Sequence, residues 1–174
     1  VSVLGLGCFP AFTGHANGTE GLKPLTLMAD TLHVWAVGAW VGGLAFVLYA
    51  NRGWLAREGK DAQSLLPLLV PGFSPVAVAS VGALVVTGSI SGWVHLSGFG
   101  DLIVTPYGQL LSLKLILAAG VFTLGFLNWR QLTPRLAEAS GQRALPRAAT
   151  AELLIVQGVL IVTSILVVTP PPAH

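Results

Sequence analysis

Long runs of apolar residues, separated by short polar segments, dominate the chain. Residues 31–50 carry no Asp, Glu, Lys or Arg over twenty positions. That length matches the roughly 20 residues that a helix needs to cross ~30 Å of hydrocarbon. Comparable runs follow at 75–94, 107–129 and 149–168. The pattern predicts an all-α fold, a polytopic membrane helical bundle with four transmembrane helices, in a single domain over residues 1–174.

Prolines and isolated charges set the expected starts of two of these helices. No charged residue occurs between Asp61 and Asp101, a stretch that is too long for one helix. Because prolines crowd the first part of that stretch and disfavour a helix interior, we expect the regular helix to begin near Pro75 and to end near Val94. The pattern places Glu152 in the first turn of the fourth helix, where a carboxylate suits the helix dipole.

The first twelve residues, VSVLGLGCFPAF, are apolar but too short to span a bilayer. They contain no initiator methionine and no basic segment, so they do not fit a signal peptide. We interpret residues 1–12 as the remnant of an upstream helix. This chain would then be the C-terminal part of a longer protein.

The composition agrees with a bilayer as the surroundings of the chain. Only 9% of the residues are charged and 53% are hydrophobic, with a mean hydropathy of +0.77, whereas a soluble domain averages about 25% charged residues. Nine Lys and Arg residues are too few for a nucleic-acid-binding surface. The single cysteine, Cys8, excludes an intrachain disulfide and a cysteine metal cluster.

Basic residues gather in two of the loops and indicate the topology. The loops after the first and third spans hold seven of the nine Lys and Arg residues: Arg52, Arg57, Lys60, Arg130, Arg135, Arg143 and Arg147. The loop at 96–106 and the C-terminal tail hold none. The positive-inside rule therefore predicts cytoplasmic basic loops and a periplasmic C-terminus in a bacterial inner membrane.

All four histidines fall on the outer side of that topology. His33 lies one turn inside the first span, and His15, His95 and His174 lie at or beyond the outer ends of spans. Imidazole is a frequent ligand of copper, zinc, iron and nickel. We therefore predict an outer metal site with His33 as its central ligand and His15 and His95 as co-ligands. The competing interpretation for each of these residues, and the one we adopt for His174, is an interfacial histidine whose ring contacts water at the lipid headgroups.

Lys114 is the one charge inside the third span, where an ammonium costs a few kcal/mol. It either snorkels to the outer surface or pairs with a buried partner, for which Asp30 and His33 are nearest by depth. Asn128 follows fourteen residues later, close to four turns, and so shares the face of Lys114. Asp30, Lys114 and Asn128 therefore form a candidate polar pathway, alongside the second span's Thr87, Ser89 and Ser91. Plain interhelical hydrogen bonds explain the same residues equally well.

An ordered set of short motifs runs through the chain. It comprises Thr13-Gly14-His15-Ala16, Asp30-Thr31-Leu32-His33, Trp40-Val41-Gly42-Gly43, Thr105-Pro106-Tyr107-Gly108, Lys114, Asn128, Arg130, Glu152 and Pro170-Pro171. This set resembles the copper resistance D (CopD) family of bacterial inner-membrane proteins. The resemblance implies a copper-handling membrane protein that moves copper from periplasm to cytoplasm. Met28 and Cys8 are the only sulfur-containing residues, so a copper site here has to rely on imidazole.

The leading hypothesis is therefore copper transport across the inner membrane or copper delivery at it. The expected partners are the lipid bilayer, the copper ion, a periplasmic copper chaperone and other membrane subunits, but no nucleic acid. One alternative is a b-type haem protein, although all the histidines lie on one side. The other is a non-catalytic helical subunit of a larger membrane complex. No catalytic triad, phosphate loop or paired acids stand out, so we do not expect an enzyme.

Overall fold

The computed structural model describes residues 23–59, 63–95 and 100–170. Four long helices make up most of this part: α2 (Lys23–Glu58), α3 (Leu66–His95), α5 (Pro106–Leu132) and α6 (Ala139–Val168). Short α4 (Asp101–Val104) precedes α5, and a 3-10 turn, η2 (Thr133–Arg135), joins α5 to α6. No strand occurs in these residues, which confirms the predicted all-α class. The expected helix remnant at 1–12 lies outside the described residues.

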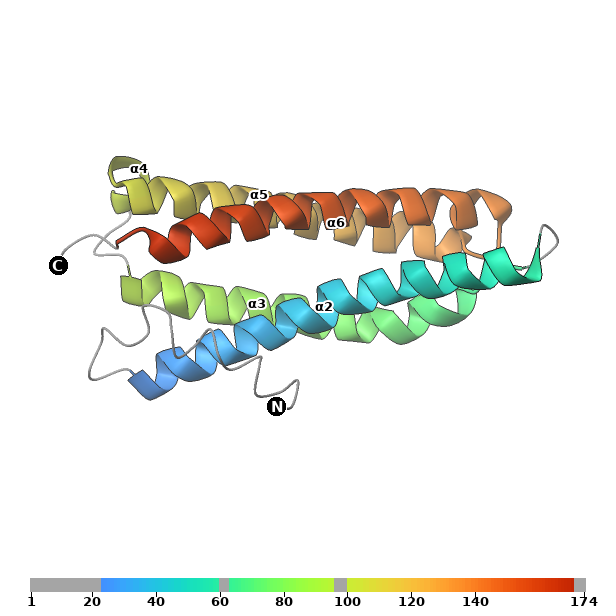
Figure 1. Ribbon diagram of the computed structural model, residues 1–174, viewed down its shortest axis with the longest axis horizontal. Helices are drawn as coiled ribbons and strands as arrows, with labels where there is room; N and C mark the ends of the chain where they lie inside the picture. The colour runs from blue at the N-terminus through green and yellow to red at the C-terminus, as the bar shows by residue number, and fades with distance from the viewer. Residues whose placement is uncertain (1–22, 60–62, 96–99, 171–174) are drawn as a thin grey trace.

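The long helices form two pairs, α2 with α3 and α5 with α6, which lie side by side (Figure 1). We call one end of the bundle the α4 end, because α4 lies there; α2 starts at this end, and α3 and α6 finish at it. We call the opposite end, where α2 connects to α3 and α5 connects to α6, the η2 end.

The outer surface of the bundle is apolar. All four long helices are long and apolar enough to cross a membrane. Large apolar side chains lie open on every one of them, for example Tyr49 at 80% exposure and Trp93 at 85%. In water such a surface would drive aggregation, whereas lipid chains cover it without cost. The predicted count of four transmembrane helices is confirmed for the described residues.

The prediction that the second helix begins near Pro75 is wrong, because α3 already begins at Leu66. Pro67 lies in the first turn, where its missing N–H removes no helical hydrogen bond. Pro71 and Pro75 lie inside the helix, and the three prolines are spaced four residues apart and are all exposed. They therefore share one face that does not pack on α2, and membrane helices tolerate proline at such positions.

The fourth helix also begins earlier than expected, at Ala139 rather than near Ala149. Its first ten residues include Pro146 and two arginines, and they extend the helix on the N-terminal side of the apolar run. Glu152 consequently lies thirteen residues after Ala139, and it is buried, with 5% of its surface exposed. The interpretation of Glu152 as a first-turn carboxylate that complements the helix dipole is wrong.

The Thr105-Pro106-Tyr107-Gly108 motif forms the start of α5. The Thr105 hydroxyl accepts a hydrogen bond from the Gly108 N–H at 3.0 Å, which caps the helix, and Pro106 occupies the first helical position. A Cβ atom added at Gly108 would lie 1.9 Å from the carbonyl oxygen of Asp101. Only glycine therefore lets the backbone of α4 pack directly against α5.

A buried apolar layer crosses the middle of the bundle. Each long helix contributes to it, through Ala36, Trp40, Leu84, Val121 and Val156. The ring of Trp40 also packs on Phe122, with ring centroids 5.4 Å apart. This central apolar layer separates the polar side chains near the α4 end from those near the η2 end.

Candidate functional site

His33 lies in the half of α2 nearer the α4 end and contacts α3. Its Nδ1 atom is 2.9 Å from the hydroxyl oxygen of Thr87. The Thr87 hydroxyl also lies 2.7 Å from the carbonyl oxygen of Ala83, and when it donates its single proton there, it accepts the proton of His33 Nδ1. The neutral His33 ring then carries its lone pair on Nε2. An imidazole held in one tautomer in this way is the usual form of a metal-binding histidine.

Charged side chains from two helices surround this pair. Asp30 lies one turn before His33 and accepts a hydrogen bond from the hydroxyl of Ser91 at 3.4 Å. Lys114 of α5 lies within electrostatic range of both Asp30 and His33. Residues of α2, α3 and α5 thus form one polar group, which we call the α4-end cluster: Asp30, His33, Thr87, Ser91 and Lys114.

The three-histidine site remains a prediction. His15 lies outside the described residues. His95 is the last residue of α3, so its backbone lies at the α4 end, but the position of its side chain is not described. Among the side chains that are described, no three from His, Cys, Asp and Glu gather as metal ligands.

The candidate polar pathway divides into two places. Lys114 belongs to the α4-end cluster together with Asp30. Asn128 lies about 21 Å further along α5 and donates a hydrogen bond to Glu152 Oε1 of α6. The central apolar layer lies between the two, so Asn128 is not part of the α4-end cluster.

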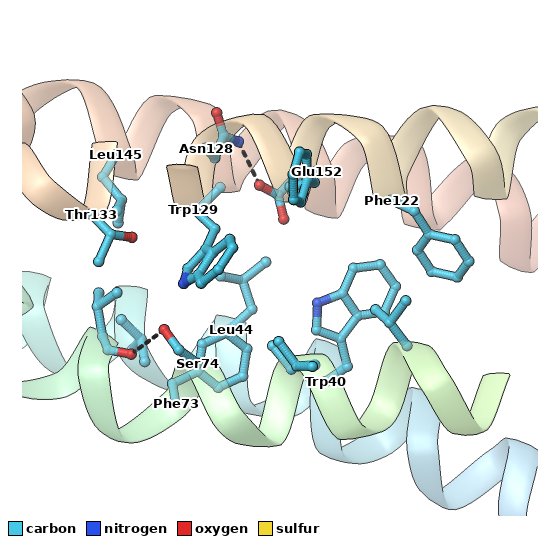
Figure 2. Close-up of a pocket in the computed structure, with 18 residues that line it drawn as sticks. Trp40, Leu44, Phe73, Ser74, Phe122, Asn128, Trp129, Thr133, Leu145 and Glu152 are labelled. Carbon is cyan, nitrogen blue, oxygen red and sulfur yellow. Dashed lines mark hydrogen bonds between the residues drawn. The ribbon is translucent and has the colours of Figure 1, made fainter. Parts of the chain in front are cut away.

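A cavity of about 390 Å³ adjoins the Asn128–Glu152 pair, between the two helix pairs (Figure 2). Most of its lining is aromatic or aliphatic, and the aromatic residues are Trp40, Phe73, Phe122, Phe126 and Trp129. Sequence patterns did not predict this cavity. Glu152 could have indicated the site, because an ionisable residue within a span usually has a functional role. It was missed because the sequence pattern placed Glu152 at a helix end.

Comparison with known proteins identifies relatives of the chain. The family model for copper resistance protein D matches residues 67–166. The copper transport protein CutJ of Bacillus subtilis (strain 168) is 31% identical over 170 residues, which cover 97% of this chain and 30% of that protein. Copper resistance protein D of Pseudomonas syringae pv. tomato is 29% identical over 145 residues, 80% of this chain and 45% of that protein. No solved structure matches.

This chain spans less than half the length of either relative. The family match covers more than half of the chain and contains Thr87, Lys114, Asn128 and Glu152. Asp30 and His33 precede the matched residues and are covered by the longer alignment with CutJ. The resemblance carried by the ordered motifs is thereby confirmed, and the chain belongs to the copper resistance protein D family.

Proposed function

We propose that this chain is a copper-handling integral membrane protein that transports copper across the inner membrane or delivers it there, with the copper ion as its cargo. Membership of the copper resistance protein D family supports this proposal, as do the names of the two relatives. The chain aligns with only 30% and 45% of the length of those relatives. That it shares the activity of the longer proteins is therefore part of the proposal. We do not propose an enzymatic step.

The observation that carries the proposal is the contact of His33 Nδ1 with the Thr87 hydroxyl at 2.9 Å, inside the bundle. We propose that Thr87 holds the Nδ1 proton, which leaves the lone pair of Nε2 for a copper ion within the bundle. We propose His33 as the central copper ligand and keep His15 and His95 as the proposed co-ligands. An imidazole set suits copper, and it is needed here because the chain offers so little sulfur.

Lys114 opposes this assignment, because an ammonium within electrostatic range of His33 repels a metal cation. Asp30 supplies the compensating charge, since its carboxylate lies within electrostatic range of Lys114 and next to His33 on α2. In the proposed site the carboxylate of Asp30 therefore balances the charge of Lys114 before copper binds, and it also attracts the copper ion.

We further propose that the η2 end faces the cytoplasm and the α4 end faces the periplasm. The described arginines at the η2 end support this orientation under the positive-inside rule: Arg52, Arg57, Arg130, Arg135, Arg143 and Arg147. Copper then reaches His33 from the periplasmic side, where a copper chaperone is the proposed donor.

The test is the copper content and copper affinity of the purified chain in lipid nanodiscs, measured by elemental analysis and by competition titration. We expect the wild type to bind copper, His33→Ala to lose it, and His174→Ala to behave as the wild type. Unchanged stoichiometry and affinity in His33→Ala would contradict the assignment of His33. A wild type that binds no copper would instead favour the role of a non-catalytic subunit, and a haem absorption band would favour the haem protein.

A further inference from the structure

The cavity beside Asn128 and Glu152 lies on the η2 side of Trp40, away from the α4-end cluster. Residues of all four long helices line it, and its volume of about 390 Å³ falls within the range of small-molecule sites. None of the residues proposed above for copper lines it. What this cavity binds is therefore a separate question from copper.

Glu152 is the only acidic residue among the cavity's described lining residues. Its Oε1 atom accepts the Asn128 hydrogen bond, and its second carboxylate oxygen points into the cavity (Figure 2). Within the described part of the chain, no Lys, Arg or His lies at ion-pair distance from Glu152. A carboxylate within a span that lacks a basic partner is costly, and a bound cation would relieve that cost.

The walls of the cavity suit a cation that has an apolar body. Trp40 and Trp129 extend into it from opposite helix pairs, and Phe73 and Phe122 line the same space (Figure 2). Aromatic faces attract cations, and rings arranged around a carboxylate are typical of sites for ammonium-type ligands. A bare metal ion needs far less room and several close polar ligands, whereas carbon makes up most of these walls.

One wall of the cavity reaches the outer surface of the bundle. Three of its lining residues are exposed on the apolar outer surface: Val78 at 63%, Phe126 at 51% and Trp129 at 50%. The route that we infer for a ligand dissolved in the membrane is therefore lateral, past these residues, and avoids both ends of the bundle.

From the carboxylate, the aromatic walls and the lateral access, we propose that this cavity binds a membrane-soluble organic cation, an ammonium or phosphonium with an apolar body, through Glu152. The proposal goes beyond copper handling and does not depend on His33.

The experiment measures binding of radiolabelled tetraphenylphosphonium to the full chain in nanodiscs, with empty nanodiscs to subtract partitioning. Tetraphenylborate, an anion of nearly the same shape, is the matched ligand control. We expect saturable binding of the cation and none of the anion. Glu152→Gln, which keeps the acceptor for Asn128, should weaken cation binding by at least about tenfold, because it removes the charge. Glu138→Gln, on the exposed start of α6, should leave binding unchanged.

Trp129→Leu provides a second variant that keeps the carboxylate and changes a half-exposed side chain. We expect it to weaken binding of the cation by roughly two- to fivefold. Gel filtration and thermal melting test whether each variant is folded. If Glu152→Gln does not fold, the proposal is tested by Trp129→Leu and by comparing the two ligands of opposite charge. The proposal is overturned if the wild type does not bind the cation, if tetraphenylborate binds as tightly, or if folded Glu152→Gln retains wild-type affinity.

Discussion

Replacing Thr87 with valine removes the hydroxyl that is proposed to fix the tautomer of His33 and leaves the size of the side chain almost unchanged. Thr87 is buried, with 4% of its surface exposed, and its oxygen lies 2.9 Å from His33 Nδ1. In Thr87→Val the Nδ1 proton loses its acceptor. The ring then favours the tautomer that carries its proton on Nε2, the atom proposed to bind copper, or it rotates away.

The expected loss of copper affinity is much larger than the expected loss of stability. Removing the partner that orients a metal-binding histidine typically costs about 10- to 100-fold in metal affinity, which is about 1.4–2.7 kcal/mol. A single side-chain hydrogen bond between membrane helices contributes about 0.6 kcal/mol on average. Thr87→Val should therefore remain folded while binding copper weakly.

Competition titration of copper, with thermal unfolding of the same samples, measures both quantities. Thr87→Ser is the matched control, because it keeps the hydroxyl that accepts from Nδ1, and its affinity should stay within about threefold of the wild type. If Thr87→Val binds copper as tightly as Thr87→Ser does, Thr87 does not prepare His33 for a metal. If Thr87→Ser loses as much affinity as Thr87→Val does, keeping the hydroxyl is not sufficient for copper binding, and the tautomer argument fails.

Three further predictions address the fold and the topology. Gly108→Ala forces the backbones of α4 and α5 apart and should cost about 1–3 kcal/mol, whereas Gly120→Ala, which meets open space, should be near neutral in a thermal melt. The buried amide of Asn51 accepts the backbone N–H just before α3, so Asn51→Leu should cost about 1–3 kcal/mol and Asn51→Asp much less. In a background without the native cysteine, Arg57→Cys and His95→Cys should react with an impermeant thiol reagent from opposite sides; reaction of both from one side would refute the topology.

The number and class of the helices followed from hydropathy because a bilayer leaves the backbone few alternatives. Every polar backbone group in hydrocarbon has to be satisfied within the chain, so an apolar run of about 20 residues forms a helix. The helix ends were harder to predict. Proline was treated as a helix breaker, a rule derived from packed helices in water, and it misplaced the start of α3 by nine residues.

The partners of the polar side chains could not be predicted for a different reason. Helical periodicity places Lys114 and Asn128 on related faces of α5, but it does not say which residues those faces meet. Pairing His33 with Thr87 requires the relative depth and rotation of α2 and α3, which their packing determines. Pairing Asn128 with Glu152 requires the true start of α6, ten residues before the expected one.

The two proposed modes of copper handling place different demands on this bundle. An ion that moves from His33 toward the η2 end meets the central apolar layer, where Trp40 packs on Phe122 two turns below His33. Carrying a dehydrated cation through such a layer is strongly unfavourable unless the layer opens. Trp40 and Phe122 belong to different helix pairs, so rocking one pair against the other would separate them without disrupting the α2–α3 or α5–α6 packing. Transport across the membrane therefore requires that movement, whereas delivery at the α4 end requires only exchange of ligands at His33.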